Sequence, residues 1–334
     1  MEQDKASQYR EELAYWLALN EGPSSVTPGM YTNAYHELGS LRALWEAPDT
    51  YLKSLGLTDR AVQTLRRYMS DSRLEDLRKQ IDDCVQRGIR ILRYVDNDYP
   101  RLLQSIGRTP EWPPLLLFQR GLDVDFEKCV AIVGTRDCSF HGRVAAMEFG
   151  KEIASEGYTV VSGLARGIDE YAHVGALMAE HGRTVAVLPF LEPVYPPEHA
   201  ELHNDVIHRG AVISERYILQ FQRSIREKLV QRNRITSGIS RCVVAIESGT
   251  DGGTVRQVEF ALSQGRKVFA FVSEQSDRLR RGYELFVRKG AIPVRTTDEV
   301  LAWLKDGNEP SKAQSPKSQD KSQETIESSW EKPR

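Results

Sequence analysis

Residues 160–169 read Val160-Val161-Ser162-Gly163-Leu164-Ala165-Arg166-Gly167-Ile168-Asp169, an apolar strand that enters a turn of small residues carrying one arginine. An earlier segment has the same design, Val130-Ala131-Ile132-Val133-Gly134-Thr135-Arg136. Each turn offers backbone amides, and its arginine offers a planar fork that matches phosphate oxygens. Two such turns at adjacent strand ends predict a surface shaped to bind phosphates.

From Lys128 onward the chain alternates apolar strands with helical segments, which is typical of a parallel sheet with helix crossovers. We expect strands at about 129–133, 158–162, 184–188, 211–214, 242–246 and 268–272. Two earlier strands are expected at Ile89-Arg90-Ile91-Leu92 and Leu115-Leu116-Leu117-Phe118. The predicted fold class is therefore α/β, a Rossmann-like doubly wound parallel sheet preceded by a small helical domain.

The N-terminal part, from about residue 7 to 75, has apolar positions at helical spacing, as in Leu13, Trp16 and Leu17. Leu55-Gly56-Leu57-Thr58 forms a turn and an N-cap before a helix that begins near Asp59. A SAM or helix-hairpin-helix-like unit, whose glycine turn could hold DNA phosphate, and a generic packing bundle fit this pattern equally.

The chain is expected to have three parts. A helical N-terminal domain covers 1–80, and an extended Rossmann-like domain covers 81–305. Residues 306–334 are rich in Ser, Lys, Gln, Glu and Pro and cannot form a core, so they are expected to be a disordered tail.

Composition and charge exclude several classes of protein. The 334 residues are 40% hydrophobic, and a formal net charge of −2 excludes a globally basic nucleic-acid coat protein. The four cysteines lack Cys-x-x-Cys spacing, which argues against zinc and against a disulfide framework. No apolar run has the length of a membrane span, and the start of the chain is not a signal peptide. We expect a cytoplasmic protein with no metal, no cofactor and no membrane partner.

Two further segments complete the predicted ligand edge, since ligands of open parallel sheets gather outside the carboxyl ends of the strands. Gln231-Arg232-Asn233-Arg234-Ile235-Thr236-Ser237-Gly238-Ile239-Ser240 reads as a basic helix start, which could extend the positive edge or form a solvated helix face. Glu247-Ser248-Gly249-Thr250-Asp251-Gly252-Gly253-Thr254 follows a buried strand and forms either an anion nest or a tight turn. The first turn lacks Gly-x-Gly-x-x-Gly spacing, which disfavours a dehydrogenase.

Individual residues on this edge receive different interpretations. Asp169 is expected to cap the following helix, and His173 is expected to pack beneath the turn rather than act as a base. Arg166 lies between small residues with little helix to cap, so we expect it to bind the ligand. The candidate phosphate-binding residues are Gly134, Thr135, Arg136, Ser162, Gly163, Arg166, Gly167, Arg232, Asn233, Arg234, Gly252, Gly253 and Thr254, and no catalytic residue is assigned.

The order of these segments resembles the DNA-processing protein A family, also called DprA or Smf. The match is carried by Gly134-Thr135-Arg136, by the run from Val161 to Asp169 with His173 and Gly175-Ala176-Leu177, and by Tyr195-Pro196, Ser214-Glu215, Arg232-Asn233-Arg234-Ile235 with Ser240, and Gly265-Arg266-Lys267-Val268-Phe269. The resemblance implies a non-enzymatic homodimer that binds single-stranded DNA along the basic edge of its sheet. It further implies that the protein helps to load the RecA recombinase during uptake and recombination of DNA. Position by position, it places the DNA contacts on Arg136, Arg166, Arg232 and Arg234, with amides from Ser162-Gly163 and Gly252-Gly253.

The chain also departs from the family pattern. Leu188-Pro189-Phe190-Leu191-Glu192-Pro193-Val194 replaces glycine-rich residues, and Leu229-Val230 replaces Phe-Pro. Asp251 stands where a phosphate-facing hydroxyl is expected. We expect no C-terminal winged-helix module, which many members have.

Two other functions stay open beside DNA binding. Gly252-Gly253-Thr254 with Glu259 is similar to the Gly-Gly-x-Gly-Thr-x-x-Glu run of lysine-decarboxylase-like phosphoribohydrolases. That similarity implies a nucleotide-binding sensor or an enzyme that cleaves nucleoside monophosphates, although Glu259 could be an ordinary helix-face residue. A regulatory or defence adaptor that does not involve RecA is the third hypothesis.

Overall fold

The computed structural model describes residues 2–20, 28–68, 70–107, 112–218, 225–272 and 276–307. Apart from its first two residues, the predicted disordered tail at 306–334 lies outside the described residues. No helix within these ranges is long and apolar enough to cross a bilayer.

The described residues form one sheet of nine strands in the order β1-β2-β6-β5-β4-β3-β7-β8-β9. The strands from β6 to β9 in this order are parallel, whereas β1 and β2 pair antiparallel at one end. Their bounds are β1 (Ile89–Arg93), β2 (Leu116–Gly121), β3 (Cys129–Gly134), β4 (Thr159–Ser162), β5 (Arg183–Val187), β6 (Ala211–Ser214), β7 (Cys242–Ile246), β8 (Lys267–Phe271) and β9 (Ile292–Val294). The predicted Rossmann-like doubly wound sheet is confirmed, and β9 is a strand that the sequence did not predict.

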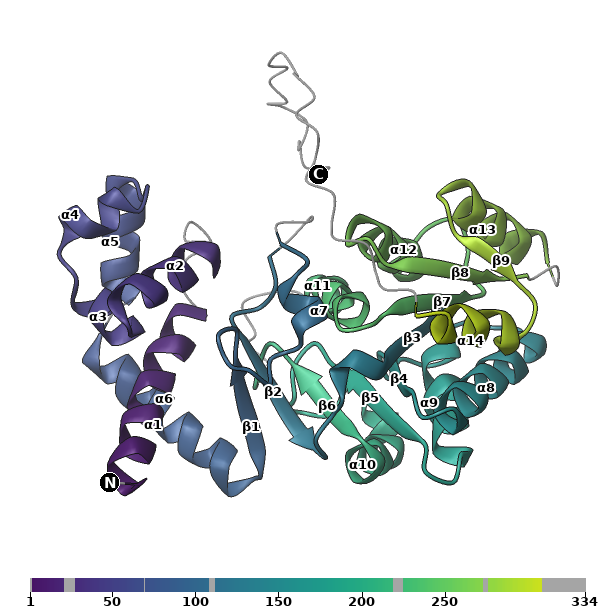
Figure 1. Cartoon of the computed structure of the whole chain (residues 1–334), viewed down its shortest axis with the longest axis horizontal. Coiled ribbons are helices and arrows are strands. Elements are labelled where there is room, and N and C mark those ends of the chain that lie inside the picture. Colours follow the sequence, from purple (N-terminus) through teal and green to yellow (C-terminus); the bar gives the residue numbers. More distant parts are fainter. Residues whose placement is uncertain are drawn as a thin grey trace, which may run out of the picture.

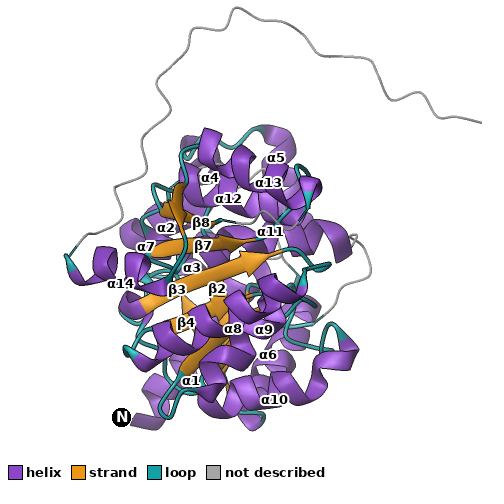
Figure 2. Ribbon diagram, turned by 90° about the vertical axis from the view of Figure 1, so that its right-hand side faces the viewer, coloured by secondary structure: helices purple, strands orange, loops and turns teal. Residues whose placement is uncertain are grey.

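The central strands of the sheet are buried on both faces, because their alternate residues face two separate apolar layers. In β3, Val130 and Ile132 face one layer, while Ala131 and Val133 face the other. On one side of the sheet lie α8 (Phe140–Ser155), α9 (Ile168–Met178), α10 (Ala200–Arg209) and α14 (Thr297–Lys305). The other side carries α7 (Arg101–Gln104), α11 (Ile225–Gly238), α12 (Gly253–Ser263) and α13 (Asp277–Arg288). Figure 2 shows the strands enclosed between helices.

Among the described residues, six helices precede the sheet, at the purple end of Figure 1: α1 (Glu2–Asn20), α2 (Pro28–Leu38), α3 (Leu41–Glu46), α4 (Asp49–Ser54), α5 (Asp59–Tyr68) and α6 (Asp71–Gln86). Thr58 accepts the N–H of Ala61 (3.3 Å) at the start of α5, as its sequence position predicts. Apolar residues of this region and of β1, β2 and β6 belong to one continuous buried cluster, which includes Trp16, Phe118 and Val212.

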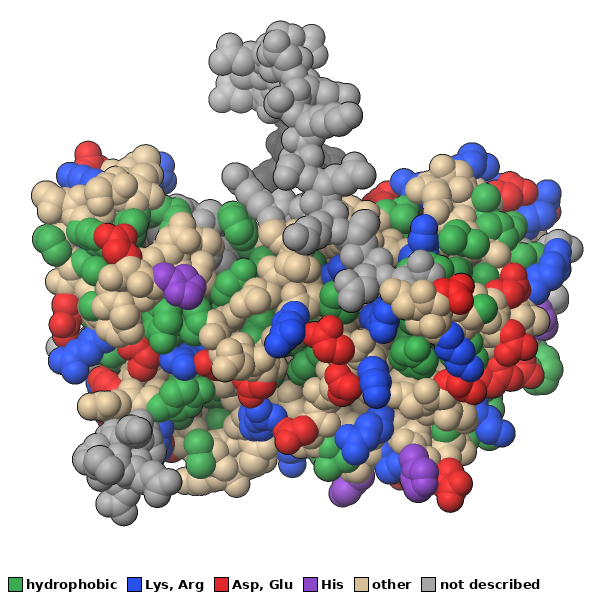
Figure 3. All heavy atoms as spheres, in the orientation of Figure 1, with side chains coloured by type: hydrophobic (Ala, Val, Ile, Leu, Met, Phe, Trp, Pro, Cys, Tyr) green, Lys and Arg blue, Asp and Glu red, His purple; other side chains and the backbone are tan. Residues whose placement is uncertain are grey.

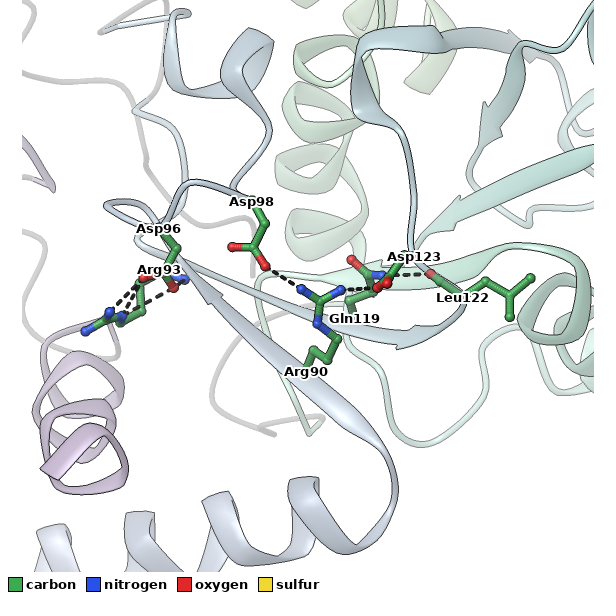
Figure 4. Close-up of polar contacts among 7 residues, drawn as sticks. All are labelled: Arg90, Arg93, Asp96, Asp98, Gln119, Leu122 and Asp123. Carbon is green, nitrogen blue, oxygen red and sulfur yellow. Dashed lines mark hydrogen bonds and ion pairs between the residues drawn. The ribbon is translucent and has the colours of Figure 1, made fainter. Parts of the chain in front are cut away.

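Arginines of β1 and its loop add polar contacts where the helices meet the sheet. Figure 4 shows Arg90 between Asp98 and Asp123, and Arg93 paired with Asp96. The guanidinium of Arg93 also lies 4.6 Å from the ring centroid of Tyr9 in α1. The exposed pairs of Arg90 add little stability, so the apolar cluster holds the two regions together.

Candidate nucleic-acid interface

A cavity of about 610 Å³ opens at the carboxyl ends of β3 and β7. These strands are neighbours, and the chain winds from β3 toward β4 on one side and from β7 toward β8 on the other. This is the topological switch point, where open α/β sheets hold ligands because the loops after the two strands diverge. The lining comes mainly from residues 133–137 and 248–254 and from α11, with Asp169, Tyr195 and Arg278 at its edges.

The turn after β3 presents Arg136 to the cavity. A Cβ on Gly134 would stand 2.0 Å from the carbonyl oxygen of Ile246, so only glycine lets β3 and β7 approach this closely. Thr135 donates its backbone N–H to the carbonyl of Glu247 (2.9 Å), which joins this turn to the one after β7. Arg136 is exposed, and no ion pair engages it within the described ranges. Its guanidinium is therefore free to meet a phosphate.

The turn after β7 directs the start of α12 at the same cavity. Gly252 has a φ of +96°, a conformation that favours glycine, and the residues after it, Gly253 and Thr254, line the cavity. Throughout α12, which is fully described, no side chain caps the N-terminus and no acid occupies the first turn. The free amides there suit an anion, although Asp251 also brings a carboxylate to the lining.

Ser162 and Gly163, whose amides we predict to bind phosphate, are not among the residues that line this cavity. Ser162 is buried and donates its hydroxyl to the carbonyl of Ile132 (2.6 Å) within the sheet. A Cβ on Gly163 would stand 1.6 Å from Nη1 of Arg232, so the glycine makes room for a side chain of the same protein.

The prediction that Asp169 caps α9 is wrong. Gly167, with a φ of +80°, holds the N-cap position and donates its N–H to Glu170 (3.3 Å). Asp169 is buried in the first turn, and its Oδ2 lies 3.9 Å from Nη2 of Arg232. Burial raises the pKa of the Asp169 carboxyl, and the positive charge of Arg232 opposes this shift.

Arg232 contributes a buried cation to the cavity. The residue is 6% exposed and donates to the carbonyl of Val187 (2.9 Å) at the end of β5. Burial lowers the pKa of its guanidinium, while the carboxylate of Asp169 counteracts that effect. Its Nε lacks a hydrogen-bond partner among the described residues. The alternative of a solvated helix face does not apply to Arg232, and the prediction of a helix start at 231 is wrong, because 231–238 form the second half of α11.

Arg234 lies away from the cavity, contrary to the prediction of a DNA contact. Its buried guanidinium donates to the carboxylate of Glu215 (2.6 Å) and to the carbonyl of Trp112 (3.0 Å). Residues two apart on a helix point in nearly opposite directions, so α11 cannot turn both arginines to one ligand. Asn233 does line the cavity and donates to the carbonyl of Gly253 (3.3 Å), the neighbouring turn.

Arg166 is exposed but does not line the cavity. Its guanidinium pairs with the carboxylate of Glu198 instead, although Ala165 and Asp169 on either side of it reach the lining. A backbone hydrogen bond, and after it the contact with Arg166, holds the pKa of Glu198 below its usual value. In this arrangement the arginine expected as a ligand is engaged by an acid at the cavity's edge.

His173 packs beneath the turn, as predicted, and is fully buried. The hydroxyl of Thr184 donates to the carbonyl of Val160 (2.9 Å), so Nδ1 of His173 must donate to that hydroxyl (2.7 Å). Burial, together with the charge of Arg232, lowers the pKa of His173 to about 3. The imidazole is therefore neutral and has a structural role.

Sequence reasoning missed three polar contributors to the cavity. Arg226 at the start of α11 and Tyr195 after β5 line it, and Arg278 of α13 donates to the backbone carbonyl of Asp137 (3.0 Å). They come from separate elements. Tyr195 belongs to the Tyr195-Pro196 pair that carries the family resemblance, whereas no local motif identifies Arg226 or Arg278. Within the described ranges, no group of three His, Cys, Asp or Glu side chains is placed to hold a metal ion.

Comparison with known proteins assigns the chain to a family. The family model described as DNA recombination-mediator protein A matches residues 90–305, the whole sheet and the cavity. The chain belongs to this family. The sequence-based resemblance to DprA and Smf is thereby confirmed.

Several relatives support the assignment. The chain is 28% identical over 299 residues to protein Smf of Synechocystis, covering 88% of this chain and 73% of that protein. It is 29% identical to DNA processing protein DprA of Streptococcus pneumoniae, covering 75% of this chain and 95% of that one. The X-ray structure of the S. pneumoniae protein superimposes with a TM-score of 0.58 at 29% identity, covering 70% and 82% of the two chains.

A second solved structure shares the fold. DNA processing protein A from Helicobacter pylori, whose structure addresses a single-stranded DNA binding mode, has a TM-score of 0.57 at 21% identity. The likeness covers 66% of this chain and 96% of the H. pylori chain. At this identity the likeness concerns the fold alone.

Glu259 lies where a helix-face residue would. It is exposed on α12 and pairs with Lys289 of the loop after α13 (2.8 Å), and it is not part of the cavity lining. The position of Glu259 agrees with the interpretation as an ordinary helix-face residue rather than with the phosphoribohydrolase-like alternative.

Proposed function

We propose that the cavity at the ends of β3 and β7 binds the sugar–phosphate backbone of single-stranded DNA, and that the chain is a binding protein rather than an enzyme. One observation carries the proposal. Arg136 and Arg226, neither engaged by an ion pair within the described residues, line one cavity with the free amides at the start of α12. Cations along a groove together with backbone donors are what sequence-tolerant binding of a single strand requires.

The charge balance inside the cavity supports this assignment. Its lining contains four arginines, at 136, 226, 232 and 278, and three aspartates, at 137, 169 and 251. Asp169 is matched by Arg232 and Asp137 by Arg278 (3.4 Å), which leaves two arginines against Asp251. On the face in Figure 3, positive and negative side chains are interspersed, so this face forms no extended basic surface for DNA.

Membership of the family also supports a proposal about the cellular process in which the chain acts. We assign the chain to the processing and recombination of DNA taken up into the cytoplasm, acting as a homodimer that assists the RecA recombinase. The relatives named DNA processing protein DprA support the process, and the single-stranded DNA binding stated for the H. pylori protein supports the ligand.

A salt titration of oligothymidylate binding by fluorescence anisotropy tests the proposal. Each phosphate contact on a single strand contributes about 0.7 to the slope of log K against log salt. Arg136→Ala and Arg226→Ala should each weaken binding and reduce the slope by about that amount. Arg288→Ala removes an exposed arginine of α13 outside the lining and serves as the control. No affinity at low salt, or the same slope in all four proteins, would overturn the proposal.

The enzymatic alternative is tested separately. Because Glu259 pairs with Lys289 outside the cavity, we expect no release of base when the protein is incubated with nucleoside monophosphates. Release that Glu259→Gln abolishes would establish cleavage of nucleoside monophosphates as the activity.

A further inference from the structure

Phe140 is an exposed aromatic residue beside the cavity. With 79% of its surface accessible, it is the most exposed large apolar residue in the described part of the chain. Neighbouring side chains do not cover it, although the next residue, His141, stacks against Phe271 at a centroid distance of 5.4 Å. Because the ring remains in contact with water, the protein does not gain the free energy of about 1.5–3 kcal/mol that burial of a Phe side chain contributes.

The backbone beneath Phe140 is held firmly. Ser139 caps α8 by accepting the N–H of Gly142 (3.0 Å), and Glu247 accepts both the N–H (2.8 Å) and the hydroxyl (2.5 Å) of Ser139. Phe140, the first residue of α8, is therefore presented by a fixed turn. A rigidly displayed ring loses little conformational entropy when something stacks on it.

The position of Phe140 follows from the same turn that lines the cavity. Asp137 belongs to the lining, and three Cα steps separate it from Phe140, a distance of at most about 11 Å. Two exposed arginines flank the ring in sequence, Arg136 in the lining and Arg143 one turn along α8. The guanidinium of Arg143 lies 5.7 Å from the ring centroid of Tyr171 in α9. Phe140 thus lies a few residues from the cavity lining along the chain, with one exposed arginine on either side of it in the sequence.

We propose that Phe140 is a stacking platform for a nucleobase of the DNA strand as it leaves the cavity past Arg136. This inference rests on the proposed function and adds a contact outside the cavity. Every nucleobase has a π face, so the contact tolerates any sequence, and the flanking arginines favour a polyanion over an apolar partner. The described lining of the cavity includes a single aromatic residue, Tyr195. Phe140 therefore adds a second aromatic ring on which a base can stack.

Oligothymidylates of two lengths test the proposal against Phe140→Ala. Stacking on an aromatic contributes about 1–3 kcal/mol per base, so affinity for a strand of about 16 nucleotides should fall about 5- to 150-fold. A dinucleotide confined to the cavity should bind both proteins equally. Since stacking neutralises no phosphate, the slope of log K against log salt should stay unchanged, unlike the slope for Arg136→Ala. Phe140→Trp should retain binding, and its fluorescence should be quenched by the long strand.

Met178→Ala is the matched control, because Met178 is another exposed apolar side chain, 54% accessible, at the far end of α9. Equal affinity of wild type and Phe140→Ala for the long strand would overturn the inference while leaving the proposed function intact. A change of molar mass in light scattering with unaltered DNA affinity would assign Phe140 to contact between protein copies instead. Absence of DNA binding by the wild-type protein at low salt would instead reject the proposed function itself.

Discussion

Nη2 of Arg232 on α11 lies 3.9 Å from Oδ2 of Asp169 on α9, and both side chains are buried beneath the cavity. The pair joins helices from opposite faces of the sheet at the point where a ligand would sit. Two charges out of water are stable only together, because each alone carries an uncompensated desolvation cost.

Arg232→Ala should therefore lower the free energy of unfolding by about 3–5 kcal/mol, since it leaves the Asp169 carboxylate buried without its partner. Urea denaturation measures this loss. Arg136→Ala removes an exposed arginine of the same cavity and should change stability by less than about 0.5 kcal/mol. Adding Asp169→Asn to Arg232→Ala should restore part of the stability. If Arg232→Ala has the same free energy of unfolding as the wild type, the two charges do not depend on each other.

Glu198→Gln should strengthen binding to single-stranded DNA, because it releases Arg166 from its ion pair. Exposed ion pairs contribute at most about 1 kcal/mol, so the gain should not exceed about fivefold. Anisotropy at low salt resolves a change of this size. The gain should vanish when Glu198→Gln is combined with Arg166→Ala. If Glu198→Gln leaves affinity unchanged, Arg166 lies outside the path of the strand.

Asp251→Ser should also raise the affinity for DNA, because a carboxylate in the lining repels phosphate. Like charges about 7 Å apart in water repel by roughly 0.6 kcal/mol, which corresponds to about threefold in affinity. Asp123→Ser, which removes an exposed aspartate near β2 outside the lining, provides the control. Weaker binding by Asp251→Ser would mean that the carboxylate contacts the ligand favourably.

Acidification should destabilise the protein through His173. Its pKa is about 3 in the folded state, against about 6.5 in an unfolded chain, so between these values the unfolded state binds one more proton. The stability it contributes is complete above about pH 6.5 and is lost as pH falls toward 3, by up to about 1.4 kcal/mol per pH unit. Urea denaturation from about pH 7 to 5 measures this slope. His173→Gln cannot titrate there and should show a smaller slope, whereas an equal slope would assign the effect to other groups.

Much of the sheet could be predicted because its central strands are continuous apolar runs between glycine turns. β9 escaped prediction because Ile292-Pro293-Val294 is only three residues long and its first two residues are exposed. The turns at 134–136 and 252–254 were found from glycine beside a hydroxyl, and both line the cavity.

The arginines were harder to place, for physical reasons. A helix turns Arg232 and Arg234 in nearly opposite directions, but which of them reaches the cavity depends on how α11 packs against the sheet and against α12. Arg278 reaches the cavity only because α13 folds back over the turn after β7. A Cβ on Gly282 of that helix would stand 1.9 Å from the carbonyl oxygen of Ser248. Tertiary packing of this kind leaves no local pattern in the sequence.

The apolar cluster that α1 to α6 share with β1, β2 and β6 bears on how this chain can be divided. A fragment that began at β1 would present Leu116 and Phe118 to water, where Trp16 and its neighbours now cover the sheet. The N-terminal helices therefore cannot be exchanged for another module, or deleted, without redesigning the surface of β2. The N-terminal helices share one apolar core with the sheet and are not a separate module joined by a linker.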